Sequence, residues 1–280
     1  MKLLRHGPSG AEHPGLMHTD GTIRDLTGLV PDIGGAVISD TGLAMLRGMD
    51  AATLPIVNAN TRLGPCVAGT GKFICIGLNY ADHAAESGLA VPPEPVIFMK
   101  ATSAICGPND PIIIPRTSVK TDWEVELAVI IGKKAKYLTA ADALTYVAGY
   151  AVANDVSERS FQAERAGQWT KGKSCDNFGQ LGPWLVTRDE VADPQALSMW
   201  LKVNGVSRQD GSTRTMVYGV AFVVAYLSQF MTLHPGDVIS TGTPPGVGMG
   251  MKPPQFLKAG DVVELGIARL GSQRQAVVAD

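Results

Sequence analysis

Residues 123–129 read Trp-Glu-Val-Glu-Leu-Ala-Val, and the apolar run continues to Ile131. Side chains of a β-strand point alternately to its two faces, so Glu124 and Glu126 share one face, while Trp123, Val125, Leu127 and Val129 share the other. This stretch is the clearest strand signal in the chain. Its acidic face has two possible explanations: a solvated strand surface, or two carboxylates that chelate a hard cation such as Mg²⁺.

A third carboxylate follows a second apolar run. Residues 148–153 (Ala-Gly-Tyr-Ala-Val-Ala) end abruptly in Asn154 and Asp155. A carboxylate at the end of a buried strand is costly unless it is paired or binds a cation, which makes Asp155 a third candidate ligand. The alternative is that Asp155 caps a helix expected over residues 157–166. Three carboxylates would leave positions for water and an anionic substrate, as is common around Mg²⁺.

The rest of the chain mixes short strands with isolated helices. Strands are expected at 73–77, 96–99, 112–114, 184–186, 198–203, 238–240 and 262–267, and helices at 40–49 (capped by Asp40 or Thr41) and 217–231. Because strands and helices do not alternate steadily, the pattern disfavours a doubly wound parallel sheet and favours a β-dominated α+β fold. A polar, Gly/Pro-punctuated stretch over 58–71 predicts a boundary between a small N-terminal domain (1–70) and a larger domain (71–280).

Composition narrows the possible partners. The 280 residues carry a net charge of −2 without a basic stripe, which argues against nucleic acid and anionic membranes as partners. No stretch approaches the roughly 20 apolar residues that span a bilayer, and the opening seven residues contain no apolar signal run. The four cysteines lack zinc-site spacing and are expected to be reduced thiols. These features predict a cytoplasmic protein.

His83 and Glu86 form a candidate catalytic dyad. A helix is expected around residues 79–86, with Asn79 or Asp82 as its cap, and positions i and i+3 of a helix share a face. Glu86 would orient His83 and raise its basicity, so that the imidazole activates a water molecule as a general base. The alternative is a surface helix on which the two residues are unrelated.

Residues 167–174 (Gly-Gln-Trp-Thr-Lys-Gly-Lys-Ser) match the phosphate-binding pattern G-x-x-x-x-G-K-[ST] in form. The segment before them is polar and helix-like rather than a buried strand, and the segment after them is rich in Gly, Asn and Pro. The context that would support nucleotide binding is therefore missing. Lys173 is instead a candidate fixed cation for an anionic substrate. Residues 240–248, rich in Gly and Thr, follow a short strand and offer backbone N–H groups that can hold a carboxylate.

Taken together, these segments resemble the fumarylacetoacetate hydrolase family. Six segments match in the family's order from about residue 72 to the end: Gly77–His83 (GLNYADH), Phe98–Lys100 (FMK), Asp122–Leu127 (DWEVEL), Asn154–Arg159 (NDVSER), Lys171–Ser174 (KGKS) and Thr241–Pro244 (TGTP). The resemblance implies a catalytic domain built as a mixed β-roll or distorted barrel, preceded by a small β-rich N-terminal domain. It also implies a homodimer.

The resemblance further implies the site. Mg²⁺ or Mn²⁺ would be held by Glu124, Glu126 and Asp155. His83 and Glu86 would form the dyad that activates water. Lys173 would stabilise a developing enolate, and the residues along the substrate would be Lys100, Arg159, Gln162 and Thr243.

The implied reaction is hydrolysis of the C3–C4 bond of a 2,4-dioxo acid of the acylpyruvate type, which yields pyruvate and a small acid. The first residues look like those of members that act on 2,4-diketo-3-deoxy sugar acids such as the fuconate or rhamnonate derivatives. Oxaloacetate decarboxylase, isomerase and ureidoglycolate lyase activities in the same fold are the alternatives.

Overall fold

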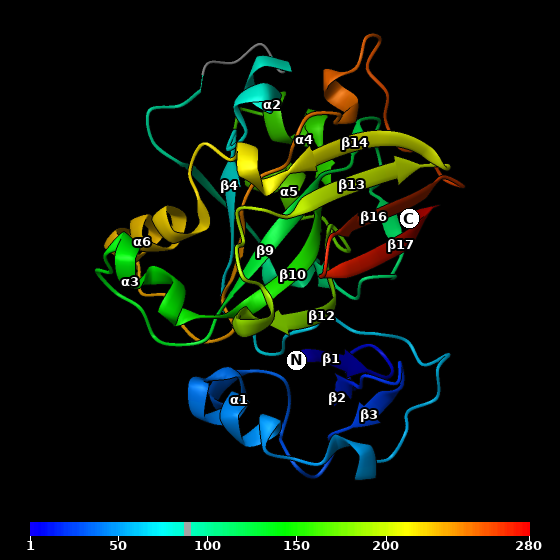
Figure 1. Cartoon of the computed structure of the whole chain (residues 1–280). Coiled ribbons are helices and arrows are strands. Elements are labelled where there is room, and N and C mark those ends of the chain that lie inside the picture. Colours follow the sequence, from blue (N-terminus) through cyan, green and yellow to red (C-terminus); the bar gives the residue numbers. More distant parts are fainter. Residues whose placement is uncertain (87–90) are drawn as a thin grey trace.

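The structure is a computed structural model that describes residues 1–86 and 91–280; the side chains of residues 83–85 also lie outside the description. Within that part, the strands form a ten-stranded, a five-stranded and a two-stranded sheet, accompanied by six α-helices (Figure 1). The β-dominated fold expected from the sequence is confirmed. None of the described helices is long and apolar enough to cross a membrane.

The large sheet has β9 and β10 near its middle. Its order is β3 (Ile23–Asp25), β2 (His13–Met17), β1 (Lys2–His6), β12 (Gly179–Thr187), β10 (Val147–Asp155), β9 (Val125–Ile131), β15 (Val238–Ser240), β4 (Phe73–Gly77) and β5 (Val96–Lys100), while β6 (Ile105–Cys106) pairs with β12. The five-stranded sheet has the order β14 (Val206–Ser212), β13 (Ser198–Val203), β16 (Val262–Ile267), β17 (Gly271–Ala279) and β7 (Ile112–Ile114). The third sheet pairs β11 (Ser157–Glu158) with β8 (Thr121–Asp122).

Both faces of β9 are buried, and each belongs to a different core. Val125, Leu127 and the next two odd-numbered residues belong to the cluster that includes the five-stranded sheet. Ala128 and Ile130 lie on the other face, in a cluster that contains much of the N-terminal segment. Glu124 and Glu126 precede those two residues on this second face.

The N-terminal segment joins the large sheet. β1 pairs with β12 in antiparallel register, with Lys2 opposite Val186. Its apolar side chains, such as Leu3 and Ile33, pack beneath β9 and β10, and Figure 1 places this segment at one end of the molecule. The domain boundary near residue 70 stays a prediction.

The helices are α1 (Asp40–Arg47), α2 (Ala81–Glu86), α3 (Ala140–Ala143), α4 (Arg159–Ala163), α5 (Thr170–Lys173) and α6 (Val220–Phe230). The expected cap of α1 was wrong: Ser39 caps it, because its backbone is extended and its hydroxyl accepts from the N–H of Gly42 at 3.2 Å. Asp40 already lies inside the helix. Asn79, one of the two residues expected to cap α2, was also wrong. Its side chain instead forms hydrogen bonds with backbone groups of Tyr218 and Thr241.

The helix expected over 157–166 is shorter, because Ser157 and Glu158 first pair with β8. Glu158 caps α4 by accepting from the N–H of Ser160 at 3.1 Å. The alternative role of Asp155 as the cap of this helix is therefore wrong. Asp155 is the last residue of β10 and is fully buried.

We predict that Leu127→Ala lowers the free energy of unfolding by about 2–5 kcal/mol, because it leaves a cavity in the core that joins the two larger sheets. Urea unfolding followed by circular dichroism measures this change. Val119→Ala is the matched control: Val119 is 72% exposed, and its truncation should change stability by less than about 0.5 kcal/mol. Equal losses in the two variants would contradict the assignment of Leu127 to the core.

Candidate active site

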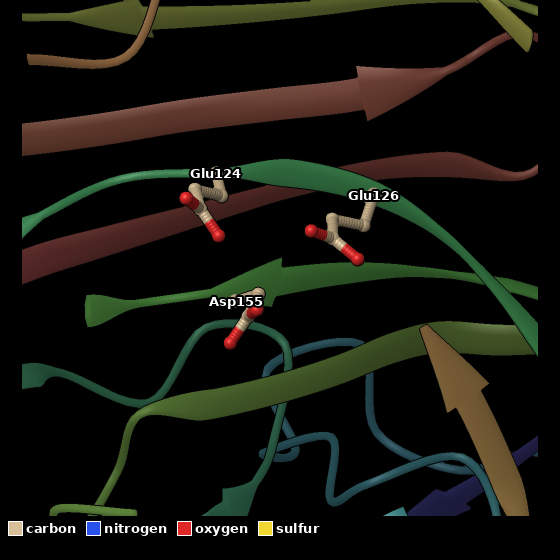
Figure 2. A group of neighbouring side chains, drawn as sticks. All are labelled: Glu124, Glu126 and Asp155. Carbon is tan, nitrogen blue, oxygen red and sulfur yellow. The ribbon is translucent and has the colours of Figure 1, made fainter. Parts of the chain in front are cut away.

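The three predicted carboxylates meet at the ends of β9 and β10. The backbone N–H of Asp155 donates to the carbonyl of Glu124 at 3.0 Å, which sets these two residues opposite each other, and Glu126 follows on the same face of β9. Ligand atoms of all three lie within 4.8 Å of one another. Figure 2 shows their carboxylates turned toward a common space. Because the three residues are at most 4% exposed, a solvated strand face is ruled out.

Three buried cations compensate the charge of two of these carboxylates. Lys173 Nζ donates to Glu124 Oε2 at 2.6 Å and to Asp155 Oδ2 at 2.7 Å. Arg159 Nη2 donates to Glu124 Oε1 at 2.6 Å, and Lys100 donates to Asp155 Oδ1. Buried charges need such partners, because removing them from water is costly. Burial by itself lowers the pKa of Lys173, but Asp155 and Glu124 outweigh it and raise that pKa.

The third carboxylate, Glu126, is held by neutral donors. Its Oε2 accepts from Ser240 Oγ at 2.6 Å and from the N–H of Gly242 at 2.8 Å. Burial, followed by the negative charges of Asp155 and Glu124, raises the pKa of Glu126 well above its usual range. The positive charges of the cluster therefore do not compensate the carboxylate of Glu126. A set of three oxygen donors with this shortage suits a hard divalent cation.

Asp122 orients the guanidinium beside this cluster. Arg159 Nε donates to Asp122 Oδ2 at 2.9 Å, and Arg159 Nη1 donates to Gln162 Oε1 at 3.1 Å. Asp122 also accepts from the N–H groups of Gly248 and Met249 at 2.7 and 3.0 Å. Our sequence reasoning did not select Asp122. The signal was there, since Asp122 continues by one step the alternation of carboxylates at 124 and 126.

The Gly/Thr loop of residues 240–248 presents N–H groups to carboxylates, as expected, but the carboxylates are side chains of the protein itself. Besides Gly242 and Gly248, the N–H of Gly246 binds the Glu86 carboxylate, at 3.0 and 3.1 Å from its two oxygens. The loop is thereby tied to α2. Thr243 Oγ donates to the carbonyl of Val125 at 2.9 Å and accepts from Gln209 Nε2 at 2.8 Å.

The predicted dyad is only partly described. His83 lies on α2, but its side chain is outside the described residues, so its pairing with Glu86 stays a prediction. α5 places Lys173 in the site, and residues 167–174 follow α4, in agreement with the sequence argument against a phosphate-binding loop.

A cavity of about 160 Å³ opens beside the carboxylates. Its lining includes six of the predicted site residues: Glu124, Glu126, Arg159, Gln162, Lys173 and Thr243. Lys100 is not part of this lining. It is 2% exposed and donates to Asp155 and to the carbonyl of Val156, so it lies behind the carboxylates. Its contact with substrate stays a prediction.

Known proteins share the sequence and the fold of this chain. Residues 72–278 match the family model described as fumarylacetoacetate (FAA) hydrolase C-terminal. The chain belongs to the fumarylacetoacetate hydrolase family. A protein of Burkholderia lata, named provisionally as a hydrolase, is 64% identical to this chain. The match runs over 276 residues and covers 98% of each chain. The family contains hydrolases and isomerases, so the chain is an enzyme of this group.

Solved structures of the family superpose over the whole chain. A fumarylacetoacetate hydrolase from Exiguobacterium antarcticum is 38% identical, with a TM-score of 0.86 and 100% of both chains covered. Maleylpyruvate hydrolase from Sphingobium sp. SYK-6, in complex with manganese(II) and pyruvate, is 31% identical with a TM-score of 0.82, covering 100% of this chain and 99% of the other. A 2-hydroxyhepta-2,4-diene-1,7-dioate isomerase from Mycobacterium marinum is 32% identical with a TM-score of 0.75 and the same coverage.

We predict that Asp122→Asn lowers kcat/KM at least about tenfold, because the variant loses the charge that pairs with Arg159 and one acceptor of the loop N–H groups. Steady-state kinetics on a substrate that the parent protein turns over measures the loss. Asp210→Asn, at an exposed position, is the control and should behave like the parent protein. Unchanged kinetics in Asp122→Asn would show that Arg159 does not need this partner.

Proposed function

We propose that this protein is a divalent-metal-dependent hydrolase that cleaves the C3–C4 bond of an acylpyruvate, a 2,4-dioxo acid, to give pyruvate and a small acid. The observation that carries the proposal is the buried group of Glu124, Glu126 and Asp155 next to Lys173, in which the two glutamates and the lysine line a small cavity. The maleylpyruvate hydrolase structure with manganese(II) and pyruvate supports it.

The three carboxylates are the proposed ligands of Mg²⁺ or Mn²⁺. Carboxylate oxygens are the donors that such hard cations prefer, and the ones here lie close enough together to share an ion. When bound, the cation supplies Lewis-acid polarisation of the substrate's 1-carboxylate and 2-oxo group. Lys173 holds Glu124 and Asp155 in place and Arg159 holds Glu124, because both cations are buried against these carboxylates.

Lys173 is the proposed electrostatic partner of the leaving group. A lysine ammonium has three N–H donors, and two of them bind Glu124 and Asp155 in the described contacts. The third can stabilise an enolate oxygen that develops in the cavity. Because the ammonium is positioned before the reaction begins, it needs little reorganisation as charge builds up on that oxygen.

His83 is the proposed general base. It takes a proton from water while the water oxygen bonds to C4 of the substrate; the C3–C4 bond then breaks and its electron pair stays with C3 as pyruvate enolate. The enolate takes up a proton to give pyruvate, and the C4 side leaves as the acid. Glu86, bound to the loop at Gly246, would orient the imidazole.

An isomerase is the second candidate, supported by the related isomerase from Mycobacterium marinum. A double-bond shift passes through an enolate of the intact 2-oxo acid, formed by loss of a proton and consumed by protonation at another carbon, with no attack of water on C4. Oxaloacetate decarboxylation also passes through pyruvate enolate. Reaction in ¹⁸O-labelled water separates these candidates, because hydrolysis alone places the label in a new acid product.

The family resemblance also supports a homodimer, which sedimentation equilibrium tests.

We predict that chelation abolishes turnover and that Mg²⁺ or Mn²⁺ restores it. Glu126→Ala should weaken metal binding, measured by titration calorimetry, because one anionic ligand is lost from a set of three. Glu190→Ala, at a side chain that is 58% exposed, serves as the control and should bind metal as the parent protein does. Full activity in metal-free protein would refute the proposed metal requirement.

We predict that His83→Ala lowers kcat by roughly a hundred- to ten-thousand-fold, the usual contribution of a positioned general base, while metal affinity stays unchanged. Single-turnover kinetics and metal titration measure the two effects separately. The control is His234→Ala, at an exposed position. A kcat close to that of the parent protein would exclude His83 as the base.

A further inference from the structure

The cavity beside the carboxylates has an apolar part as well as a charged one. Besides the acidic and basic residues, its lining contains Leu78, Phe98, Ala163, Trp169 and Met249. None of these residues belongs to the proposed metal or proton-transfer machinery. They come from β5, from the ends of β4 and α4, and from the segments before α5 and after β15.

The apolar part begins next to Lys173. The ammonium of Lys173 lies 4.9 Å from the centroid of the Phe98 ring. The Phe98 ring in turn packs edge-on against Trp169, with 5.2 Å between the centroids and 63° between the planes. A substrate whose enolate oxygen binds Lys173 therefore has an aromatic wall within reach of its remaining atoms.

The backbone is shaped to receive the Trp169 ring. A Cβ atom added at Gly77 would lie 2.7 Å from Trp169 Cζ3, too close for real atoms. Gly77 lies at the end of β4 opposite Val96 and does not have a positive φ, so its backbone would accept other residues. Glycine at this position therefore makes room for the indole ring. Ala166 and Gly167, with φ of 62° and 65°, turn the chain just before Trp169.

Several polar groups nearby already form hydrogen bonds within the protein. The guanidinium of Arg159 binds Asp122, Glu124 and Gln162. The hydroxyl of Thr243 is bonded on both its donor and its acceptor side. A hydroxylated or charged tail packed against the rings of Phe98 and Trp169 would lose hydrogen bonds to water, because ring carbon atoms do not replace them.

We infer that the subsite of Phe98 and Trp169 binds a short hydrocarbon acyl tail, and that Trp169 is a specificity-determining residue. This inference rests on the proposed function, because the tail is the C4 side of the acylpyruvate. It disfavours the polyhydroxylated tail of a diketo-deoxy sugar acid and the second carboxylate of a fumarylpyruvate. The cavity of about 160 Å³ limits the tail to a few carbons.

The test compares pyruvate release from acetylpyruvate, butanoylpyruvate, the dihydroxylated analogue of butanoylpyruvate, and fumarylpyruvate, all with one Mg²⁺ concentration. In the parent protein, kcat/KM should rise about fourfold for each methylene added from acetyl to butanoyl. The hydroxylated analogue and fumarylpyruvate should be at least about tenfold poorer than butanoylpyruvate.

The variants isolate the indole ring. Trp169→Ala should abolish the gain per methylene, because the ring that the added carbons would contact is lost. Trp169→Phe should keep most of the gain. Gly77→Ala should reduce it by displacing the ring. Tyr137→Ala, at an aromatic residue that is 70% exposed, is the matched control and should leave the substrate preference unchanged.

The results distinguish two failures. No pyruvate from any acylpyruvate would overturn the proposed function. Pyruvate release with a preference for the hydroxylated or the fumaryl tail would overturn the subsite alone, as would an equal loss on all tails in Trp169→Ala. If Trp169→Ala does not fold, the substrate series measured with the parent protein and with Trp169→Phe decides. The inference is rejected if kcat/KM of the parent protein does not rise with each added methylene.

Discussion

The burial of three carboxylates at one point of a β-sheet is the constraint on which the rest of this structure depends. Each buried negative charge must be compensated, because the protein interior solvates charge far less well than water does. Lys100, Lys173 and Arg159 supply that compensation for Glu124 and Asp155, and all three cations are almost fully buried. Segments distant in sequence are held together at this point by charge as well as by apolar packing.

The backbone around the cavity also helps to compensate buried negative charge. N–H groups of the loop 242–248 bind Glu126, Glu86 and Asp122, so one loop connects the two acidic strand residues with α2. A loop tied down at three carboxylates has little freedom to rearrange when an anionic substrate arrives. The charged part of the cavity is therefore largely preorganised, which is the condition under which fixed charges stabilise a transition state well.

This arrangement separates two tasks in one small cavity. In the proposed function, the charged part would bind the atoms common to all acylpyruvates, while the aromatic part, with Phe98 and Trp169, would contact the atoms in which they differ. Such a division fits a family in which proteins of the same fold carry the names of hydrolases and isomerases acting on different acids. Change in the aromatic part can alter the preferred acid without disturbing the buried charges.

The sequence by itself determined the local features: the strand alternation that puts Glu124 and Glu126 on one face, and the short strands and helices on either side. These follow from periodicity, which acts between near neighbours. Only the tertiary structure decided that Asp155 faces Glu124 instead of capping α4, and that Asp122 holds Arg159. Strand pairing and buried charge pairs join residues far apart in the chain, and no local pattern records them.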